Sequence, residues 1–149
     1  MILGFKEQID GVPTHFKEKI LAGVNLELAH MPKLHTLRAG NRWKAGDTIH
    51  MATGVRTRSY NQFNKGIPQL SVCKSVQDVK IKWKEGGFIE HLYPIDVFVD
   101  GKQLDIIQLL QFVRNDGFTK GIFTEFNMFY RWFNKDFEGQ IVHWTDLRY

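Results

Sequence analysis

The stretch VKIKWK, residues 79–84, alternates strictly between apolar side chains and lysines. Because successive side chains of a β-strand point to opposite faces of a sheet, this pattern predicts a half-buried antiparallel strand. A second β signal follows at Ile95–Leu104, where the dipeptide Asp100-Gly101 separates two short arms with apolar alternation. Asp-Gly is a preferred pair in tight turns, so this segment predicts a hairpin.

Two helices are predicted after the hairpin. Asp105 is suited to cap a helix over Ile106–Arg114, which ends at the turn Asn115-Asp116-Gly117. From Lys120 to Phe133, apolar residues recur at offsets of four and three, which predicts a second helix with an aromatic stripe that packs on the core. The stripe consists of Ile122, Phe123, Phe126, Phe129, Tyr130 and Phe133.

The rest of the chain predicts one more helix and several short strands. Residues 14–23 favour a short helix, with Thr14 as its cap and Gly23 as its end. Short strands are expected over residues 1–9, 33–38, 48–53 and 140–147, and the last of them is expected to pair near the N-terminal strand. Residues 24–32 form a less regular insert. Many short strands and three helices favour a single α+β domain over residues 1–149, built as a small barrel with helices at its side.

Bulk composition narrows the class of protein. A chain of 149 residues with 43% hydrophobic content can build one core, and no repeat or low-complexity linker divides it. We expect a soluble, cytoplasmic protein without a membrane partner, because there is neither a signal peptide nor an apolar run of membrane-spanning length. Cys73 is the single cysteine, which excludes an internal disulfide. We expect no metal and no cofactor, because five histidines lack metal-ligand spacing: His15, His30, His50, His91 and His143.

Charge is distributed unevenly along the chain. Residues 1–84 carry fourteen Lys and Arg against six acids, whereas residues 85–149 carry six against ten. Between Lys33 and Lys65, only Asp47 opposes seven basic residues. Such clusters attract the phosphates of RNA by releasing condensed counterions, although a solvated basic face is an equally good interpretation.

Three short segments combine reactive side chains. They are Lys33–Arg38, with an amine, an imidazole, a hydroxyl and a guanidinium; Arg42–Asp47, a loop that turns into a strand; and Asn115–Thr119, a carboxylate between two helices. Taken singly, each is ordinary: a solvated strand face, a turn and a helix end. Their joint order is more informative than any one of them.

Together with the preceding helix, these segments resemble the ASCH domain family. The matching segments are Ile20-Leu21-Ala22-Gly23, Lys33-Leu34-His35-Thr36-Leu37-Arg38, Trp43-Lys44-Ala45-Gly46-Asp47, and Asp116-Gly117-Phe118-Thr119 followed by Glu125-Phe126 and Trp132-Phe133. The resemblance implies a PUA-like barrel with a cleft beside it, and binding of RNA or nucleotides. Some bacterial members are amidohydrolases that remove the acetyl group of N4-acetylcytidine with a lysine, a threonine and a glutamate. Carried over, the catalytic positions are Lys33, Thr36 and Asp116.

This chain departs from that pattern at two points. It has aspartate where the amidohydrolases have glutamate, and it carries the insert at residues 24–32. A carboxylate that is one methylene shorter reaches about 1 Å less, and such a displacement can cost on the order of a hundredfold in rate. On a regular strand Lys33 and Thr36 would also face opposite sides, so they converge only if Lys33 precedes the strand or a bulge intervenes.

Three functional hypotheses follow. The first is a module that binds RNA or a nucleoside, in which Lys33, Thr36 and Asp116 contact the ligand. Its further ligand-binding residues are His35, Arg38, Arg42, Trp43, Lys44, Arg56, Arg58 and Tyr60. The alternative is a nucleoside amidohydrolase that uses the same three residues. A helix-turn-helix DNA reader over residues 106–133 ranks last, because its second helix starts with Lys120 as the lone basic residue.

Overall fold

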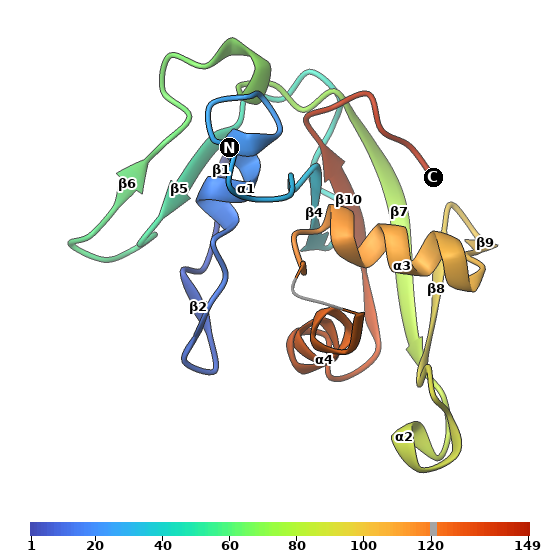
Figure 1. Cartoon of the computed structure of the whole chain (residues 1–149). Helices are drawn as coiled ribbons and strands as arrows, with labels where there is room; N and C mark the ends of the chain where they lie inside the picture. Colours follow the sequence, from blue (N-terminus) through green and yellow to red (C-terminus); the bar gives the residue numbers. More distant parts are fainter. Residues whose placement is uncertain (120–121) are drawn as a thin grey trace.

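The computed structural model describes the chain at residues 1–119 and 122–149, and the side chains of residues 122–125 fall outside that description. Some sequence predictions therefore concern residues or side chains outside this description: Lys120 and the side chains of Ile122, Phe123 and Glu125. The described part is a mixed α+β fold with two separate sheets and a small hairpin (Figure 1). The predicted α+β class is confirmed.

The larger sheet has five strands in the order β4-β10-β7-β8-β9, and all neighbours are antiparallel. The strands are β4 (His35–Ala39), β10 (Phe137–His143), β7 (Ser75–Trp83), β8 (Ile95–Val99) and β9 (Lys102–Gln103). The alternation predicted within β7 is confirmed, because Val79 and Ile81 are buried while Lys80 and Lys82 are exposed. The hairpin between β8 and β9 turns at Asp100 and Gly101, both with positive φ, as the dipeptide predicts.

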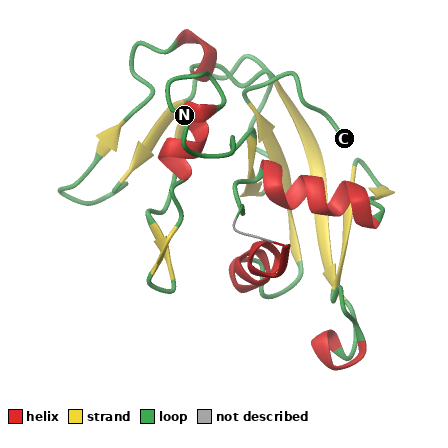
Figure 2. Cartoon of the chain, in the orientation of Figure 1, coloured by secondary structure: helices red, strands yellow, loops and turns green. Residues whose placement is uncertain are grey.

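Helices α3 (Ile106–Asn115) and α4 (Ile122–Trp132) join this sheet to form the main core (Figure 2). The Asp105 side chain accepts a hydrogen bond from Gln108 N, and the Gln108 side chain accepts one from Asp105 N, so the predicted cap is a complete capping box. The aromatic stripe of α4 is confirmed where its side chains are described. These buried residues are Phe126, Phe129, Tyr130 and Phe133.

The smaller sheet is built from the first half of the chain. It consists of β1 (Ile2–Gly4), β5 (His50–Thr53) and β6 (Asn61–Gln62), with β1 parallel to β5 and β5 antiparallel to β6. The hairpin β2 (Gln8–Ile9) and β3 (Val12–Pro13) leads into α1 (Phe16–Ala22). The remaining short helices are the 3-10 turn η1 (Pro68–Leu70) and α2 (Gly87–Glu90), which extends from the β7–β8 connection (Figure 1).

Three local expectations require correction. Across the described residues, the strand pairings do not close either sheet into a barrel. The C-terminal strand does not pair near the N-terminal strand: β10 is an interior strand between β4 and β7, which agrees with the burial of both Ile141 and Val142. Thr14 is not the N-cap of α1, because His15 occupies that position and Thr14 Oγ1 donates instead to the Lys6 carbonyl, 2.5 Å away.

Residues 24–32 contain neither helix nor strand, as predicted, and connect α1 to β4. Leu28 in this insert is 88% exposed, so the insert adds little to the core. No helix in the described part of the chain is long and apolar enough to cross a membrane.

Candidate functional site

The start of β4 meets the turn between α3 and α4 at a buried ion pair. Lys33 Nζ lies 2.6 Å from Asp116 Oδ1 and also donates to the Asp116 backbone carbonyl. Their side chains are only 2% and 5% exposed. Lys33 lies two residues before β4, so the irregular start required by the sequence is present. Two of the three residues expected to form the site are therefore in direct contact.

Backbone hydrogen bonds hold the Lys33 segment in place. Lys33 N donates to the Lys19 carbonyl of α1 at 2.9 Å, and Leu34 N donates to the Asn115 carbonyl of α3 at 2.8 Å. The segment that carries the lysine is thus tied to both helices before the strand begins. This arrangement explains how a lysine just after an irregular insert reaches a carboxylate 83 residues away.

Aromatic rings and a glycine enclose the Lys33 ammonium. Lys33 Nζ lies 4.6 Å from the centre of the Phe16 ring and 6.0 Å from that of Phe5, within the range of cation–π attraction. Gly117 has φ +92°, and a Cβ there would come within 2.9 Å of Lys33 Cδ and 3.0 Å of the Phe16 ring. The turn therefore needs glycine for its conformation and for this close approach.

Burial moves the pKa values of both partners toward neutrality. It lowers the pKa of Lys33 to about 8, although the nearby Asp116 carboxylate opposes that shift. It also raises the pKa of Asp116, against the opposing effects of Lys33 and Arg38. A Lys33 amine is consequently easier to deprotonate than a surface lysine.

Two further basic side chains lie near this turn in the described part of the chain. The half-buried Arg38 donates from Nη2 to the Gly4 carbonyl at 2.7 Å, and its guanidinium carbon lies 5.3 Å from the Phe5 ring centre. Burial, with a smaller contribution from Arg42, lowers the pKa of Arg38 to about 10. Lys19, also buried, donates to the Gly117 carbonyl at 2.6 Å. Two cations, Lys33 and Arg38, thus act on the Asp116 carboxylate, and Lys19 holds the next peptide unit of the same turn.

Thr36 is the third predicted catalytic residue, and its environment differs from that of the pair. It is 4% exposed on β4, next to His35, and so faces the other side of the strand from that residue. Among the described residues, no hydrogen bond joins the Thr36 hydroxyl to Lys33 or Asp116. The structure brings together a pair rather than a triad.

His35 is a core residue rather than a ligand-facing one. It is fully buried, its Nε2 lies 2.8 Å from the Tyr149 hydroxyl, and its Nδ1 lies 3.8 Å from Asp116 Oδ1. Its ring packs against Phe112 and His143. Burial therefore lowers the pKa of His35 well below its ordinary value.

Trp43 does not offer the stacking face expected from the sequence. It is 2% exposed, and its backbone N–H and carbonyl both bond to the Gln140 side chain, at 3.0 and 3.2 Å. Tyr60, at 44% exposure, does present a ring to solvent. The remaining predicted ligand-binding residues are exposed basic side chains: Arg42, Lys44, Arg56 and Arg58.

Sequence reasoning missed two residues that help to build the site. Lys19 and Phe16 share one face of α1 with Ile20, because residues three and four positions apart lie on the same side of a helix. A lysine within an otherwise apolar helical face was the available signal for Lys19. Phe16 is an apolar residue typical of a helical core face, and its contact with Lys33 depends on the tertiary fold.

No cluster of three metal-ligating side chains of the His, Cys, Asp or Glu type occurs within the described residues. No family model matches the chain, and no curated protein or solved structure shows significant similarity to it. The interpretation of the site therefore depends on its own geometry.

We expect Asp116→Asn to lower the free energy of unfolding by about 3–5 kcal/mol, because it leaves the Lys33 ammonium buried without its counter-charge. Urea titrations provide the measurement. Combining Asp116→Asn with Lys33→Met should lower the free energy of unfolding by less than the sum of the two single substitutions, because the charges are coupled. Glu138→Gln is the control: it breaks the exposed Lys80–Glu138 pair, whose side chains are 57% and 61% exposed, and should change stability by no more than about 1 kcal/mol. Additive single effects would contradict the coupling.

Stability should also fall with acid because of His143. Burial lowers the pKa of His143 to about 4, and neither ring nitrogen has a hydrogen-bond partner among the described residues. The unfolded chain takes up this proton near pH 6.5, so the stabilising effect is complete above that pH and is lost as the pH falls through 4. Urea titrations between these pH values should show a smaller slope for His143→Gln than for the unaltered chain, by up to about 1.4 kcal/mol per pH unit. The exposed His50→Gln is the control, and an unchanged slope in His143→Gln would refute the assignment.

Proposed function

We propose that this chain binds RNA or a nucleoside, with the base recognised at the Lys33–Asp116 pair and phosphates held by the surrounding basic residues. The observation that supports this proposal most strongly is the buried Asp116 carboxylate set beside Lys33 and Arg38. The resemblance to ASCH domains and their PUA-like fold supports the same function. Kinship with that family is part of the proposal.

The carboxylate provides the base-specific element. An aspartate accepts hydrogen bonds from an exocyclic amine, which cytosine and adenine present and uracil lacks. Lys33 Nζ donates a hydrogen bond to Asp116 Oδ1 and so orients the carboxylate. A base that donates to this carboxylate would form its hydrogen bond at a buried position. A base without such a donor would leave the carboxylate oxygen unpaired, so the site would discriminate strongly between the two kinds of base.

The basic residues provide the part of the affinity for RNA that does not depend on the base sequence of the RNA. Arg38 is half-buried beside the pair, and Arg42, Lys44, Arg56 and Arg58 are exposed in the segments that follow β4 and β5. Such side chains bind phosphates and release counterions. Tyr60 lies close to Arg58 in sequence, and its exposed ring is available to stack on a base of a single strand.

Binding of a single-stranded RNA should therefore weaken steeply as salt is added. Fluorescence anisotropy with a labelled oligonucleotide measures the dissociation constant over a series of salt concentrations. For single strands, each phosphate contact that is lost should reduce the log–log salt slope by about 0.7, so Arg38→Gln and Arg58→Gln should each flatten it. Lys102→Gln, at an exposed position in the β8–β9 hairpin, is the charge-matched control and should leave the slope unchanged. A salt-independent affinity in the unaltered chain would reject the proposal.

The lowered pKa of Lys33, about 8, favours a second candidate function, removal of an acyl group from a modified nucleoside such as N4-acetylcytidine. The neutral Lys33 amine would take the proton of the Thr36 hydroxyl, whose oxygen attacks the acyl carbon. The C–N bond then breaks, and the leaving amine receives the proton from Lys33. Water would next hydrolyse the acyl-threonine ester to release acetate. This route requires the ligand to bring Thr36 and Lys33 within hydrogen-bond distance.

The second candidate predicts acetate release from N4-acetylcytidine. Thr36→Val keeps the shape of the side chain but removes the nucleophile, so the rate should fall by at least about a hundredfold. Thr48→Val removes a hydroxyl from another part of the chain and should leave the rate unchanged. An equal rate in Thr36→Val would exclude the threonine as nucleophile, while binding of RNA without turnover would leave the first candidate in place.

A further inference from the structure

Tyr149 bonds to residues on both sides of the candidate site. Its hydroxyl accepts a hydrogen bond from Asn115 Nδ2 at 3.0 Å and lies 2.8 Å from His35 Nε2. Asn115 is the last residue of α3 and directly precedes Asp116, whereas His35 begins β4, two residues after Lys33. One hydroxyl group therefore joins the two segments that carry the ion pair.

The chemistry of the three groups determines the direction of these hydrogen bonds. The amide nitrogen of an asparagine only donates, so the hydroxyl accepts from Asn115. The single proton of the hydroxyl is then available to His35 Nε2, which accepts it when the ring is neutral. Burial favours these neutral forms, because it raises the pKa of Tyr149 and lowers that of His35.

A reciprocal pair of hydrogen bonds fixes the Tyr149 main chain to the larger sheet. Tyr149 N donates to Gln77 Oε1 at 2.9 Å, and Gln77 Nε2 donates to the Tyr149 main-chain oxygen at 3.0 Å. Gln77 is a buried residue of β7, and its amide also donates to Asp100 Oδ2 at 2.9 Å. The Tyr149 ring packs edge to face on Phe112, with ring centres 5.2 Å apart. Main chain and ring are both held, so the hydroxyl has a defined position.

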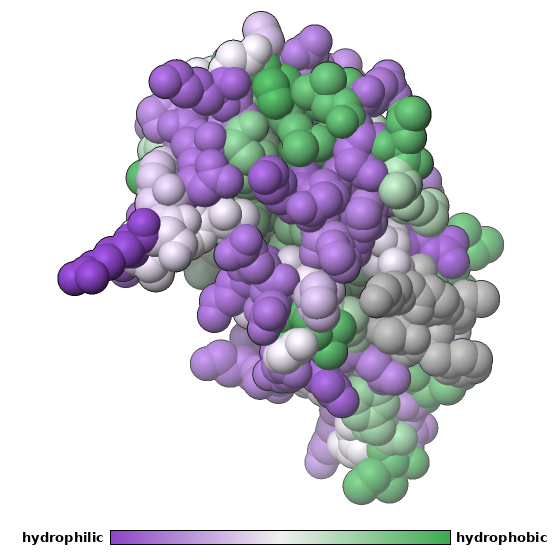
Figure 3. Space-filling view, turned by 60° about the vertical axis from the view of Figure 1, so that its left-hand side comes forward, coloured by the Kyte–Doolittle hydropathy of each residue, from purple (hydrophilic) through white to green (hydrophobic). Residues whose placement is uncertain are grey.

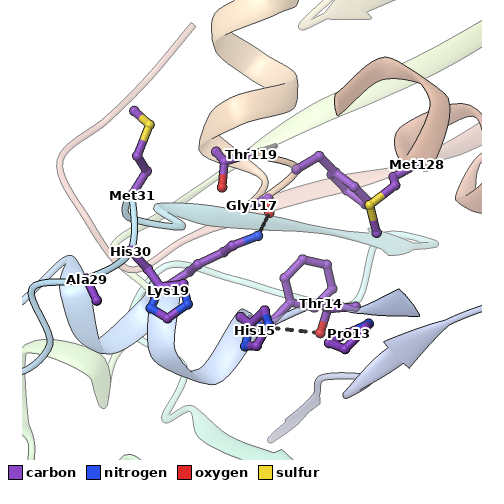
Figure 4. Close-up of a pocket in the computed structure, with 12 residues that line it drawn as sticks. Pro13, Thr14, His15, Lys19, Ala29, His30, Met31, Gly117, Thr119 and Met128 are labelled. Carbon is purple, nitrogen blue, oxygen red and sulfur yellow. Dashed lines mark hydrogen bonds between the residues drawn. The ribbon is translucent and has the colours of Figure 1, made fainter. Parts of the chain in front are cut away.

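The turn that carries Asp116 is therefore fixed at both of its ends. On one side, the Tyr149 hydroxyl binds the Asn115 side chain. On the other side, Lys19 Nζ donates to the Gly117 carbonyl at 2.6 Å, as Figure 4 shows. A carboxylate on a turn that is held in this way keeps one orientation toward a bound base, which selective recognition requires.

Selection of a base depends more on these buried groups than on the exposed surface. The face of the molecule drawn in Figure 3 is mainly hydrophilic, with apolar side chains between. Exposed cations bind the phosphates of any RNA sequence. A buried carboxylate, in contrast, is left unpaired by a base that lacks a donor, so its orientation affects the choice between bases.

We propose that Tyr149 is a positioning residue of the nucleoside site, and that its hydroxyl determines how strongly the site prefers a base with an exocyclic amine. This inference rests on the proposed base recognition at Asp116 and adds a specificity-determining residue to it. Tyr149 acts through Asn115 and His35 rather than on the ligand itself. Loss of its hydroxyl loosens the turn that carries Asp116 and leaves the exposed cations unchanged.

Fluorescence anisotropy with labelled oligocytidylate and oligouridylate of equal length tests this inference. The unaltered chain should bind oligocytidylate at least about tenfold more tightly than oligouridylate. Tyr149→Phe should reduce this ratio to about threefold or less, and it should leave the salt slope of oligouridylate binding unchanged, because no phosphate contact is lost. Tyr130→Phe is the matched control: it removes the hydroxyl of another buried tyrosine, on α4, and should preserve the ratio.

A second variant tests the same hydrogen bond from its other side. Asn115→Ala should also reduce the ratio, and the double variant should resemble Tyr149→Phe, because both substitutions remove one shared contact. If Tyr149→Phe does not fold, the ratio in Asn115→Ala decides.

Two results would overturn the inference and leave the proposed function in place. One is an unchanged ratio in both Tyr149→Phe and Asn115→Ala, and the other is an equal reduction of the ratio in Tyr130→Phe. Equal affinity of the unaltered chain for the two RNAs would instead reject base recognition at Asp116, and this inference with it.

Discussion

The contact between Lys33 and Asp116 is the interaction on which the rest of the site depends. It joins the entry to β4 with the turn between α3 and α4, and so links the larger sheet to the helices beside it. Because both charges are almost fully removed from water, each requires the other, and loss of one leaves a buried charge that is costly. Phe16 and Gly117 close around the pair without adding charge. The same residues that stabilise the fold therefore also define the candidate site.

Local patterns predicted the elements whose burial is one-sided. The alternation at residues 79–84 and the aromatic stripe of α4 each reflect one apolar face and one exposed face, which sequence periodicity reports directly. The cap at Asp105 was predictable because it depends only on hydrogen bonds within four residues. The pairing of β10 was not predictable in this way. The second half of β10 is buried on both faces, so its sequence carries no alternation that indicates its neighbours. Whether the strands close into a barrel depends on strand order, which local patterns do not determine. The pairings of the described residues form open sheets.

The candidate site was predictable only in part, for a similar reason. The motif order identified Lys33 and Asp116. The strand begins at His35 and not at Lys33 as expected, so of the two conditions set for Lys33, a position before the strand is the one observed. Trp43 was assigned to ligand binding on the basis of residue type, yet Gln140 and the core enclose it. Lys19 lies on a seven-residue helix whose apolar face looked like ordinary packing. Burial of a long polar side chain depends on contacts nearly a hundred residues away, and such contacts leave no local signature.

The two lysines bond to adjacent peptide units: Lys33 to the carbonyl of Asp116, and Lys19 to that of Gly117. These two peptide planes meet at the Cα of Gly117, so one turn of backbone connects α1 with the ion pair. Both ammonium groups therefore hold the same turn from different elements, Lys19 from α1 and Lys33 from the entry to β4. A displacement of either lysine would move a carbonyl next to the one that the other lysine binds, so the positions of the two side chains are coupled through Gly117.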